Sequence, residues 1–159
     1  MKQLIITLLL AFCSATISFA QLTANSVSHK KVTVKTSSSG AKTAMWLKAN
    51  TCYTIELTST VKNGYFKVRR IYNMDSDYEV RMHGSTTGYW ISCNDLVCYL
   101  EAGWGRRSVY ASPSTSSALV TVIDDGTPCT PLAVSGNWVK VRCNGRVGWV
   151  KNEGFGASA

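Results

Sequence analysis

The stretch SVYASPSTSSALVTVIDDGTPCTPLAVSGNWVKVRCNGRVGWVKNEGF, residues 108–155, decides the fold class. Within it, residues 118–123 (ALVTVI) and 138–142 (WVKVR) are short runs rich in β-branched and aromatic residues, which favour strands. Turn signals separate the runs, among them Asn144-Gly145, a pair typical of a tight hairpin turn. Short strands joined by tight turns predict a small β-barrel or sandwich.

The same pattern continues toward the N-terminus. Residues 51–58 (TCYTIELT) place Tyr53, Ile55 and Leu57 on one face and polar residues on the other, the period of a half-buried strand. Residues 65–71 (YFKVRRI) form another short run of strand-favouring residues. No window of a dozen residues has good helical periodicity, so we predict an all-β fold for the whole mature chain.

The chain also repeats itself, which is the strongest internal signal. Residues 65–69 (YFKVR) match residues 138–142 (WVKVR) at an offset of 73, and residues 90–91 (WI) match residues 149–150 (WV) at an offset of 59. The motifs follow the same order in both halves. The drop in offset predicts an insert of 14 residues in the first copy, which we place at about 71–88.

These motifs carry a family resemblance. Residues 108–155 resemble the bacterial SH3-like domain in four features: a Ser/Pro-rich loop after the first strand, Gly-Thr at 126–127, Gly-x-Trp-x-Lys-Val at 136–141 and Gly-Trp-Val at 148–150. Residues 32–96 resemble a diverged copy of the same pattern, with an insert and without the Gly before the Trp. The resemblance implies two tandem small SH3-like β-barrels, each of five strands.

The N-terminal segment has the pattern of a cleaved secretory signal peptide. Residues 1–2 (MK) supply positive charge, residues 4–12 are almost wholly apolar but too short to span a bilayer, and residues 18–20 (SFA) suit a cleavage site. An uncleaved anchor and lipidation at Cys13 are the alternatives. We expect an exported protein, periplasmic or secreted, with no membrane segment after cleavage at residue 20.

These observations together predict the domain organisation. A signal peptide occupies residues 1–20, and a first SH3-like domain follows over residues 21–100. A linker at residues 101–107 then leads into a second SH3-like domain over residues 108–159. The oligomeric state has no signal in the sequence.

Charge and the scarcity of histidine argue against catalysis and nucleic-acid binding. Lys and Arg outnumber Asp and Glu by 8, but the excess is dispersed, which suits solvated strands and attraction to anionic envelope polymers. The two histidines, His29 and His83, lie in polar or loop segments, and no catalytic motif accompanies them. We therefore predict a non-enzyme without a metal or cofactor, and no nucleic-acid partner.

The cysteines predict one specific bond. A hairpin centred on Gly136 places Cys129 opposite Cys143, close enough for a disulfide, and export favours the oxidised form. Buried free thiols are the alternative. The pairing of the other mature cysteines, Cys52, Cys93 and Cys98, stays open. Three cysteines can form only one bond among themselves, so one of them is a free thiol or bonds to another molecule.

The aromatic residues predict where a ligand would bind. Trp90 and Trp149 occupy the family's Gly-Trp-Val position, where we expect core packing with a structural role. The resemblance implies a groove near the start of the central strand, and such an aromatic-lined groove suits extended peptides or sugar rings. The predicted ligand-binding residues are Tyr65, Tyr110, Asn137 and Trp138.

The resemblance implies an exported, non-catalytic binding module. We expect it to recognise cell-wall peptide (peptidoglycan) or another envelope ligand, with the second copy as the better binder. Two alternatives stay open: a structural or protein–protein interaction component of the cell envelope, and an accessory subunit of a cell-wall hydrolase.

Overall fold

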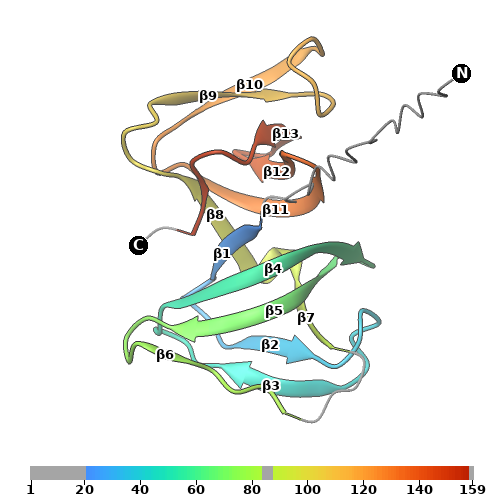
Figure 1. Cartoon of the computed structure of the whole chain (residues 1–159), viewed down its shortest axis with the longest axis vertical. Helices are drawn as coiled ribbons and strands as arrows, with labels where there is room; N and C mark the ends of the chain where they lie inside the picture. Colours follow the sequence, from blue (N-terminus) through green and yellow to red (C-terminus); the bar gives the residue numbers. More distant parts are fainter. Residues whose placement is uncertain (1–20, 84–87, 158–159) are drawn as a thin grey trace, which may run out of the picture.

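The structure is a computed structural model that describes residues 21–83 and 88–157 of the chain (Figure 1). Within these residues it contains 14 strands and one short 3₁₀ helix, η1 (Cys93–Asp95), and no α-helix. The predicted all-β fold is thus confirmed. The predicted signal peptide, residues 1–20, lies outside the described residues. No helix in the described part of the chain is long and apolar enough to cross a membrane.

The strands form two units stacked along the long axis of the molecule (Figure 1). The N-terminal unit, lower in Figure 1, holds seven strands, and η1 connects it to the C-terminal unit above. The strands of the N-terminal unit are β1 (Leu22–Ser26), β2 (Val32–Lys35), β3 (Thr43–Leu47), β4 (Tyr53–Lys62), β5 (Tyr65–Asn73), β6 (Tyr78–Glu79) and β7 (Tyr89–Ser92). Those of the C-terminal unit are β8 (Leu96–Leu100), β9 (Arg106–Tyr110), β10 (Leu119–Asp124), β11 (Pro128–Ser135), β12 (Trp138–Cys143), β13 (Arg146–Lys151) and β14 (Phe155–Gly156).

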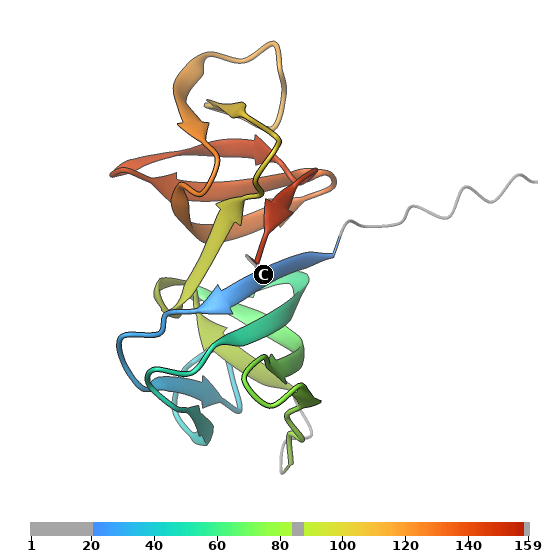
Figure 2. The ribbon, with the colours of Figure 1, turned by 90° about the vertical axis from the view of Figure 1, so that its left-hand side faces the viewer.

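Strand β8 joins the two units into one hydrogen-bonded sheet. The strand order is β10-β9-β13-β12-β11-β8-β1-β4-β5-β7-β2-β3, with β14 paired to β8 and β6 paired to β5. The first residues of β8, Leu96 and Val97, pair with β1 of the N-terminal unit. Its later residues, from Cys98 to Leu100, pair with β11 and β14. Figure 2 shows β8 rising from the lower unit into the upper one.

Alternation of side chains along the strands builds the core. In β4, Tyr53, Ile55 and Leu57 are all buried, as their period of two predicts. Buried residues of both units belong to one contiguous hydrophobic cluster. Leu96 and Leu100 of β8 are members of that cluster, so the shared strand also links the two halves of the core.

Two Asn-Gly turns fix the register of the hairpins on which the fold depends. Asn144 and Gly145 have φ values of 50° and 75°, and they join β12 to β13. Asn63 and Gly64, with φ values of 53° and 74°, join β4 to β5 in the same way. Positive φ at both central residues is the conformation that matches the twist of paired strands, and Asn-Gly adopts it at low cost.

The structure describes the expected linker and most of the expected insert, of which residues 84–87 lie outside the described residues. After β5, the chain returns through β6, whose Tyr78 and Glu79 pair with the end of β5. Between the units, β9 begins at Arg106, so Arg106 and Arg107 belong to a strand. Glu101 is held by a hydrogen bond from its N–H to the carbonyl of Gly154, at 2.9 Å.

Candidate ligand-binding face

One face of the C-terminal unit gathers aromatic and basic side chains from three neighbouring strands. In the β12–β13 pair, Trp138 lies opposite Lys151 and Lys140 lies opposite Trp149, while Trp149 also lies opposite Tyr110 of β9. Directly opposed residues of an antiparallel sheet project from the same side. We call this set of five residues the aromatic face.

The opposite side of the same strands faces the core. Val139 and Val141 of β12 and Val150 of β13 are fully buried, and they alternate with members of the aromatic face. Gly148 lets β13 approach β9 at this point, because a Cβ there would lie 2.7 Å from the carbonyl oxygen of Tyr110. The close approach brings Trp149 and Tyr110 side by side.

Ring contacts give the aromatic face a defined geometry. The centroids of the Tyr110 and Trp138 rings are 5.9 Å apart, with an angle of 83° between the planes. This edge-to-face arrangement is one that aromatic pairs favour. The Nζ atom of Lys140 lies 5.9 Å from the centroid of the Trp149 ring, within the range of a cation–π contact. All three rings are half-buried, so part of each remains open to a ligand.

Asn137 lies in the turn just before β12, next to Trp138, and it contacts the turn that follows β13. Its Nδ2 donates to Oε1 of Glu153 at 3.3 Å, and its carbonyl accepts from the N–H of Asn152 at 2.9 Å. Its side chain is exposed but already engaged with Glu153. Asn152 was not singled out from the sequence, and it is the more unusual residue: its Oδ1 is buried with no hydrogen-bond partner among the described residues.

Tyr65, the fourth predicted ligand-binding residue, lies in the other unit. It begins β5 opposite Ser92 of β7 and is half-buried. Its hydroxyl packs against the loop between β2 and β3, where a Cβ on Gly40 would come within 2.8 Å of it. The structure thus brings Tyr110, Asn137 and Trp138 together and leaves Tyr65 apart from them.

The two tryptophans expected in the core are placed differently. Trp149 is half-buried on the aromatic face, and its neighbour Val150 takes the core position with no exposed surface. The expectation of a core ring for Trp149 therefore does not hold, because strict alternation puts only one of two consecutive residues inside. Trp90, by contrast, is 8% exposed and is buried as expected, although the contiguous cluster contains its neighbour Ile91 and not Trp90 itself.

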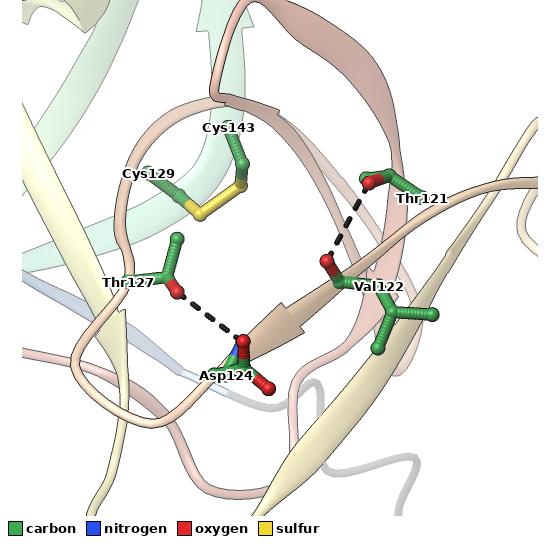
Figure 3. The surroundings of a disulfide bond; sticks show 6 residues. All are labelled: Thr121, Val122, Asp124, Thr127, Cys129 and Cys143. Carbon is green, nitrogen blue, oxygen red and sulfur yellow. Dashed lines mark hydrogen bonds between the residues drawn. A yellow bond between two sulfur atoms is a disulfide. The ribbon is translucent and has the colours of Figure 1, made fainter.

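The predicted disulfide is present between Cys129 and Cys143 (Figure 3). The two residues are directly opposed in β11 and β12, with their Cα atoms 4.6 Å apart, so the predicted Cys129–Cys143 pairing is confirmed. The turn itself pairs Ser135 with Trp138, one residue away from a hairpin centred on Gly136, and a register shift between Pro131 and Ala133 brings the two cysteines opposite each other. Figure 3 also shows the turn before β11, where the N–H of Asp124 donates to the hydroxyl of Thr127 at 3.2 Å. The cysteines without a disulfide, among the described residues, are Cys52, Cys93 and Cys98.

No metal-binding cluster of three or more His, Cys, Asp or Glu side chains occurs in the described residues. His29 and His83 are both exposed and lie in different segments of the N-terminal unit. The rings and the two lysines of the aromatic face offer stacking and charge attraction.

Comparison with known proteins identifies the segment that carries this face. No curated protein matches the chain. NlpC2 and NlpC1 from Trichomonas vaginalis are among the similar solved structures, with 15% and 17% identity and a TM-score of 0.33 each. They cover 86% and 85% of this chain, which spans only about half of theirs, 48% and 45%. Likeness at that level supports no argument.

The family comparison is more specific. The model described as "Bacterial SH3 domain" matches residues 108–155, which contain the whole aromatic face and the disulfide. The features that pointed to this family in the sequence, such as Gly-Trp-Val at 148–150, are those that shape the β9–β13–β12 surface. Residues 108–155 of the chain are one bacterial SH3 domain.

Proposed function

We propose that the protein is an exported, non-catalytic binding module that recognises cell-wall peptide through the aromatic face. The observation that carries the proposal is the half-open cluster of Tyr110, Trp138 and Trp149 within a bacterial SH3 domain. Large, rigid rings that are partly exposed dominate the energy of many binding surfaces. The basic N-terminus and apolar run of residues 1–12 support export.

The face also suits the chemistry of that ligand class. Wall peptides are extended chains that carry free carboxylates. Lys140 and Lys151 stand beside Trp149 and Trp138 in adjacent registers, so a chain lying across the rings would meet two ammonium groups. A charge-assisted hydrogen bond to a carboxylate is stronger than a neutral one. Aromatic stacking supplies affinity, and the lysines select for an anionic group.

We further propose that the N-terminal unit is a diverged SH3-like copy. Its strands repeat the register of the aromatic face: Trp90 of β7 lies opposite both Lys67 and Lys35, as Trp149 lies opposite Lys140 and Tyr110. The offsets between equivalent residues follow those of the sequence repeat.

Main-chain hydrogen bonds repeat as well. The N–H of Cys93 donates to the carbonyl of Gly64 at 2.9 Å, as that of Asn152 donates to Asn137 at 2.9 Å. The N–H of Val27 donates to the carbonyl of Asp95 at 3.0 Å, as that of Glu101 donates to Gly154. Equivalent turns close both units, which is what a duplicated barrel requires.

The strand β8 fits both copies at once. Ser26 pairs with Leu96 at the end of the N-terminal unit, and Leu100 pairs with Phe155 at the corresponding place of the C-terminal unit. Under the repeat, β8 is the last strand of the first copy and the first strand of the second. Residues 101–105 then correspond to the loop after β1, inside the second copy. The two copies share β8, and the expected linker at 101–107 belongs to the second copy.

The two copies differ in what they offer a ligand. In the N-terminal unit Trp90 is buried and flanked by Lys67 and Lys35, and no second aromatic ring opposes it. The aromatic face of the C-terminal unit has three half-open rings. We therefore assign ligand binding to the C-terminal unit and a supporting role to the N-terminal unit.

The test compares Trp138→Ala with Trp46→Ala. Trp46 is 57% exposed on β3 of the N-terminal unit, so it controls for loss of any exposed ring. Binding to a soluble wall peptide is measured by calorimetry, and folding by circular dichroism. Trp138→Ala should weaken binding at least tenfold, about 1.4 kcal/mol. Trp149→Ala should also weaken binding and leave the fold intact, since its ring is outside the core.

Two results would contradict the proposal. Equal loss of binding in Trp46→Ala would show that the aromatic face is not the site. A folded wild-type protein that binds no wall peptide, yet forms a stable complex with an envelope protein, would make the protein an interaction component of the envelope instead.

A further inference from the structure

Three cysteines stand in one row across neighbouring strands of the C-terminal unit. Cys129 of β11 lies opposite Cys143 of β12 on one side and opposite Cys98 of β8 on the other. Directly opposed side chains project from the same face of a sheet. All three are buried, with exposures of 0% for Cys98, 2% for Cys129 and 1% for Cys143. The central cysteine of the row thus has two cysteine neighbours and is bonded to one of them.

The register also places the second neighbour within bonding reach. The Cα separation of 4.6 Å between Cys129 and Cys143 is that of a pair without mutual main-chain hydrogen bonds, about 4.5 Å. The two pair types alternate across a central strand, so Cys129 and Cys98 form the hydrogen-bonded type, about 5.5 Å apart. Disulfides span Cα separations of about 4.4–6.8 Å. Either neighbour can therefore bond to Cys129.

The N-terminal unit shows what an ordinary row looks like at this place. Ile55 of β4 lies opposite Ala24 of β1 and Ile71 of β5, and all three residues are fully buried. These are apolar core residues with no reactive group. In the C-terminal unit cysteine stands at each of the corresponding positions, so the row that is inert in one unit carries three sulfur atoms in the other.

The thiol of Cys98 connects the row to the other unit. Its Sγ donates to the main-chain carbonyl of Thr23 in β1 at 3.4 Å. Burial raises the pKa of this thiol, so the neutral form persists in the folded protein. Cys98 is therefore held as a protonated thiol between the disulfide and the N-terminal unit.

We propose that Cys98, Cys129 and Cys143 form an internal thiol–disulfide exchange site. In the exchange, Cys98 loses its proton and its sulfur attacks Sγ of Cys129. The Cys129–Cys143 bond breaks, and its electron pair leaves on Sγ of Cys143, which takes up a proton. The products are a Cys98–Cys129 disulfide and a free Cys143 thiol. One disulfide and one thiol exist before and after, so no external oxidant or reductant takes part.

The exchange changes what the crosslink holds together. The Cys129–Cys143 bond closes the single hairpin of β11 and β12, and its two ends have a sequence separation of 14. A Cys98–Cys129 bond ties β11 to the strand that both units share, and it removes the hydrogen bond to Thr23. The thiolate is the attacking species, so exchange is slow at neutral pH and faster when the pH rises or β8 opens.

The first experiment uses variants of the full mature chain in which Cys52 and Cys93 are replaced by alanine. Cys143→Ala leaves Cys98 and Cys129 on adjacent strands. Cys129→Ala leaves Cys98 and Cys143 two strands apart, about 10 Å, which is beyond disulfide reach. After treatment with oxidised glutathione, we expect Cys143→Ala to lose both free thiols and yield a Cys98–Cys129 peptide. Cys129→Ala should keep both thiols free of an internal bond.

The second experiment needs no change to the row. The chain with only Cys52 and Cys93 replaced is held at rising pH, trapped with N-ethylmaleimide and mapped without reduction. A Cys98–Cys129 peptide with alkylated Cys143 should accumulate as the pH rises, and Cys98→Ala should abolish it. Alanine occupies the corresponding position, residue 24, so this variant is expected to fold.

The results that would overturn the proposal are specific. A Cys143→Ala variant that is folded by circular dichroism but keeps both thiols free would refute the geometry. Where that variant does not fold, the second experiment decides: recovery of the Cys129–Cys143 peptide alone at every pH would refute the exchange.

Discussion

The disulfide acts on stability through two buried sulfurs. Cys129 and Cys143 close a hairpin with a sequence separation of 14, and cross-links of this size typically contribute about 2–4 kcal/mol. We predict that Cys129→Ser lowers the free energy of unfolding by about this amount. The double variant with Cys143→Ser should cost about the same, because both variants lose one bond. Urea unfolding without reductant measures this, with exposed Cys52→Ser as the control that should change little.

A second residue-scale prediction concerns alkaline pH. Burial raises the pKa of the Cys93 thiol from 9.0 to about 11, although Arg142 acts in the opposite direction. Between these values the unfolded chain loses the proton while the folded protein keeps it. The unfolded state then binds fewer protons, so stability falls as the pH rises from 9 toward 11. Cys93→Ala should make the fall in urea midpoint over this range shallower, and an unchanged fall would contradict the assignment.

At the scale of elements, β8 is the strand on which most depends. Proline in a central strand removes a ladder hydrogen bond, whereas edge strands and bulges tolerate it. Val97 lies in β8 opposite Asn25, while Leu119 lies in the edge strand β10 at a register shift. We predict that Val97→Pro abolishes the folding transition. Leu119→Pro should lower the melting temperature by a few degrees, the shift that corresponds to a loss of about 1 kcal/mol in the free energy of unfolding. Thermal melting followed by circular dichroism distinguishes the two.

The strands themselves could be read from the sequence because alternation is a local property. Period two in residues 51–58 predicts the buried face of β4, as the structure has it. A turn at Gly136 predicts the Cys129–Cys143 pairing, but the register shift between Pro131 and Ala133 on which that pairing depends has no local signal. The family motif predicts a core position for Trp149, whereas its place next to the buried Val150 predicts the opposite face of the strand. Strand parity would have put it on the outside, as the structure does.

Other features have no local signal. Residues 96–100 look like one short strand, and nothing in them tells that one end pairs with β1 and the other with β11 and β14. The cysteine row likewise depends on the pairing of β8 with β11, which joins segments about thirty residues apart. The burial of Asn152 has one signal in the sequence: at the repeat offset of 59, Asn152 matches Cys93, a residue type that is often buried.

At the scale of the whole molecule, the continuous core predicts one folding unit. The hydrophobic cluster runs through both units, and β8 supplies strand partners to each. We predict a single cooperative unfolding transition for the mature chain. A fragment of residues 101–159 lacks β8 and should show no unfolding transition. If residues 101–107 were a linker between two separate domains, the same fragment would contain a complete second domain and would fold. Calorimetry of the mature chain and of the fragment tests the prediction. Two separate transitions in the mature chain would contradict it.

The shared strand also imposes an order of assembly. Once the chain has emerged as far as Leu100, every strand of the N-terminal unit and the partner of β1 exist, so that unit can close while the rest is still being delivered. The free part of β8 then serves as a template onto which β11 and β14 add. The last step brings the end of the chain back to β1, where the N–H of Ala157 donates to the hydroxyl of Thr23 at 3.3 Å. During synthesis we therefore expect the N-terminal unit to form first, whereas the completed chain unfolds as one unit.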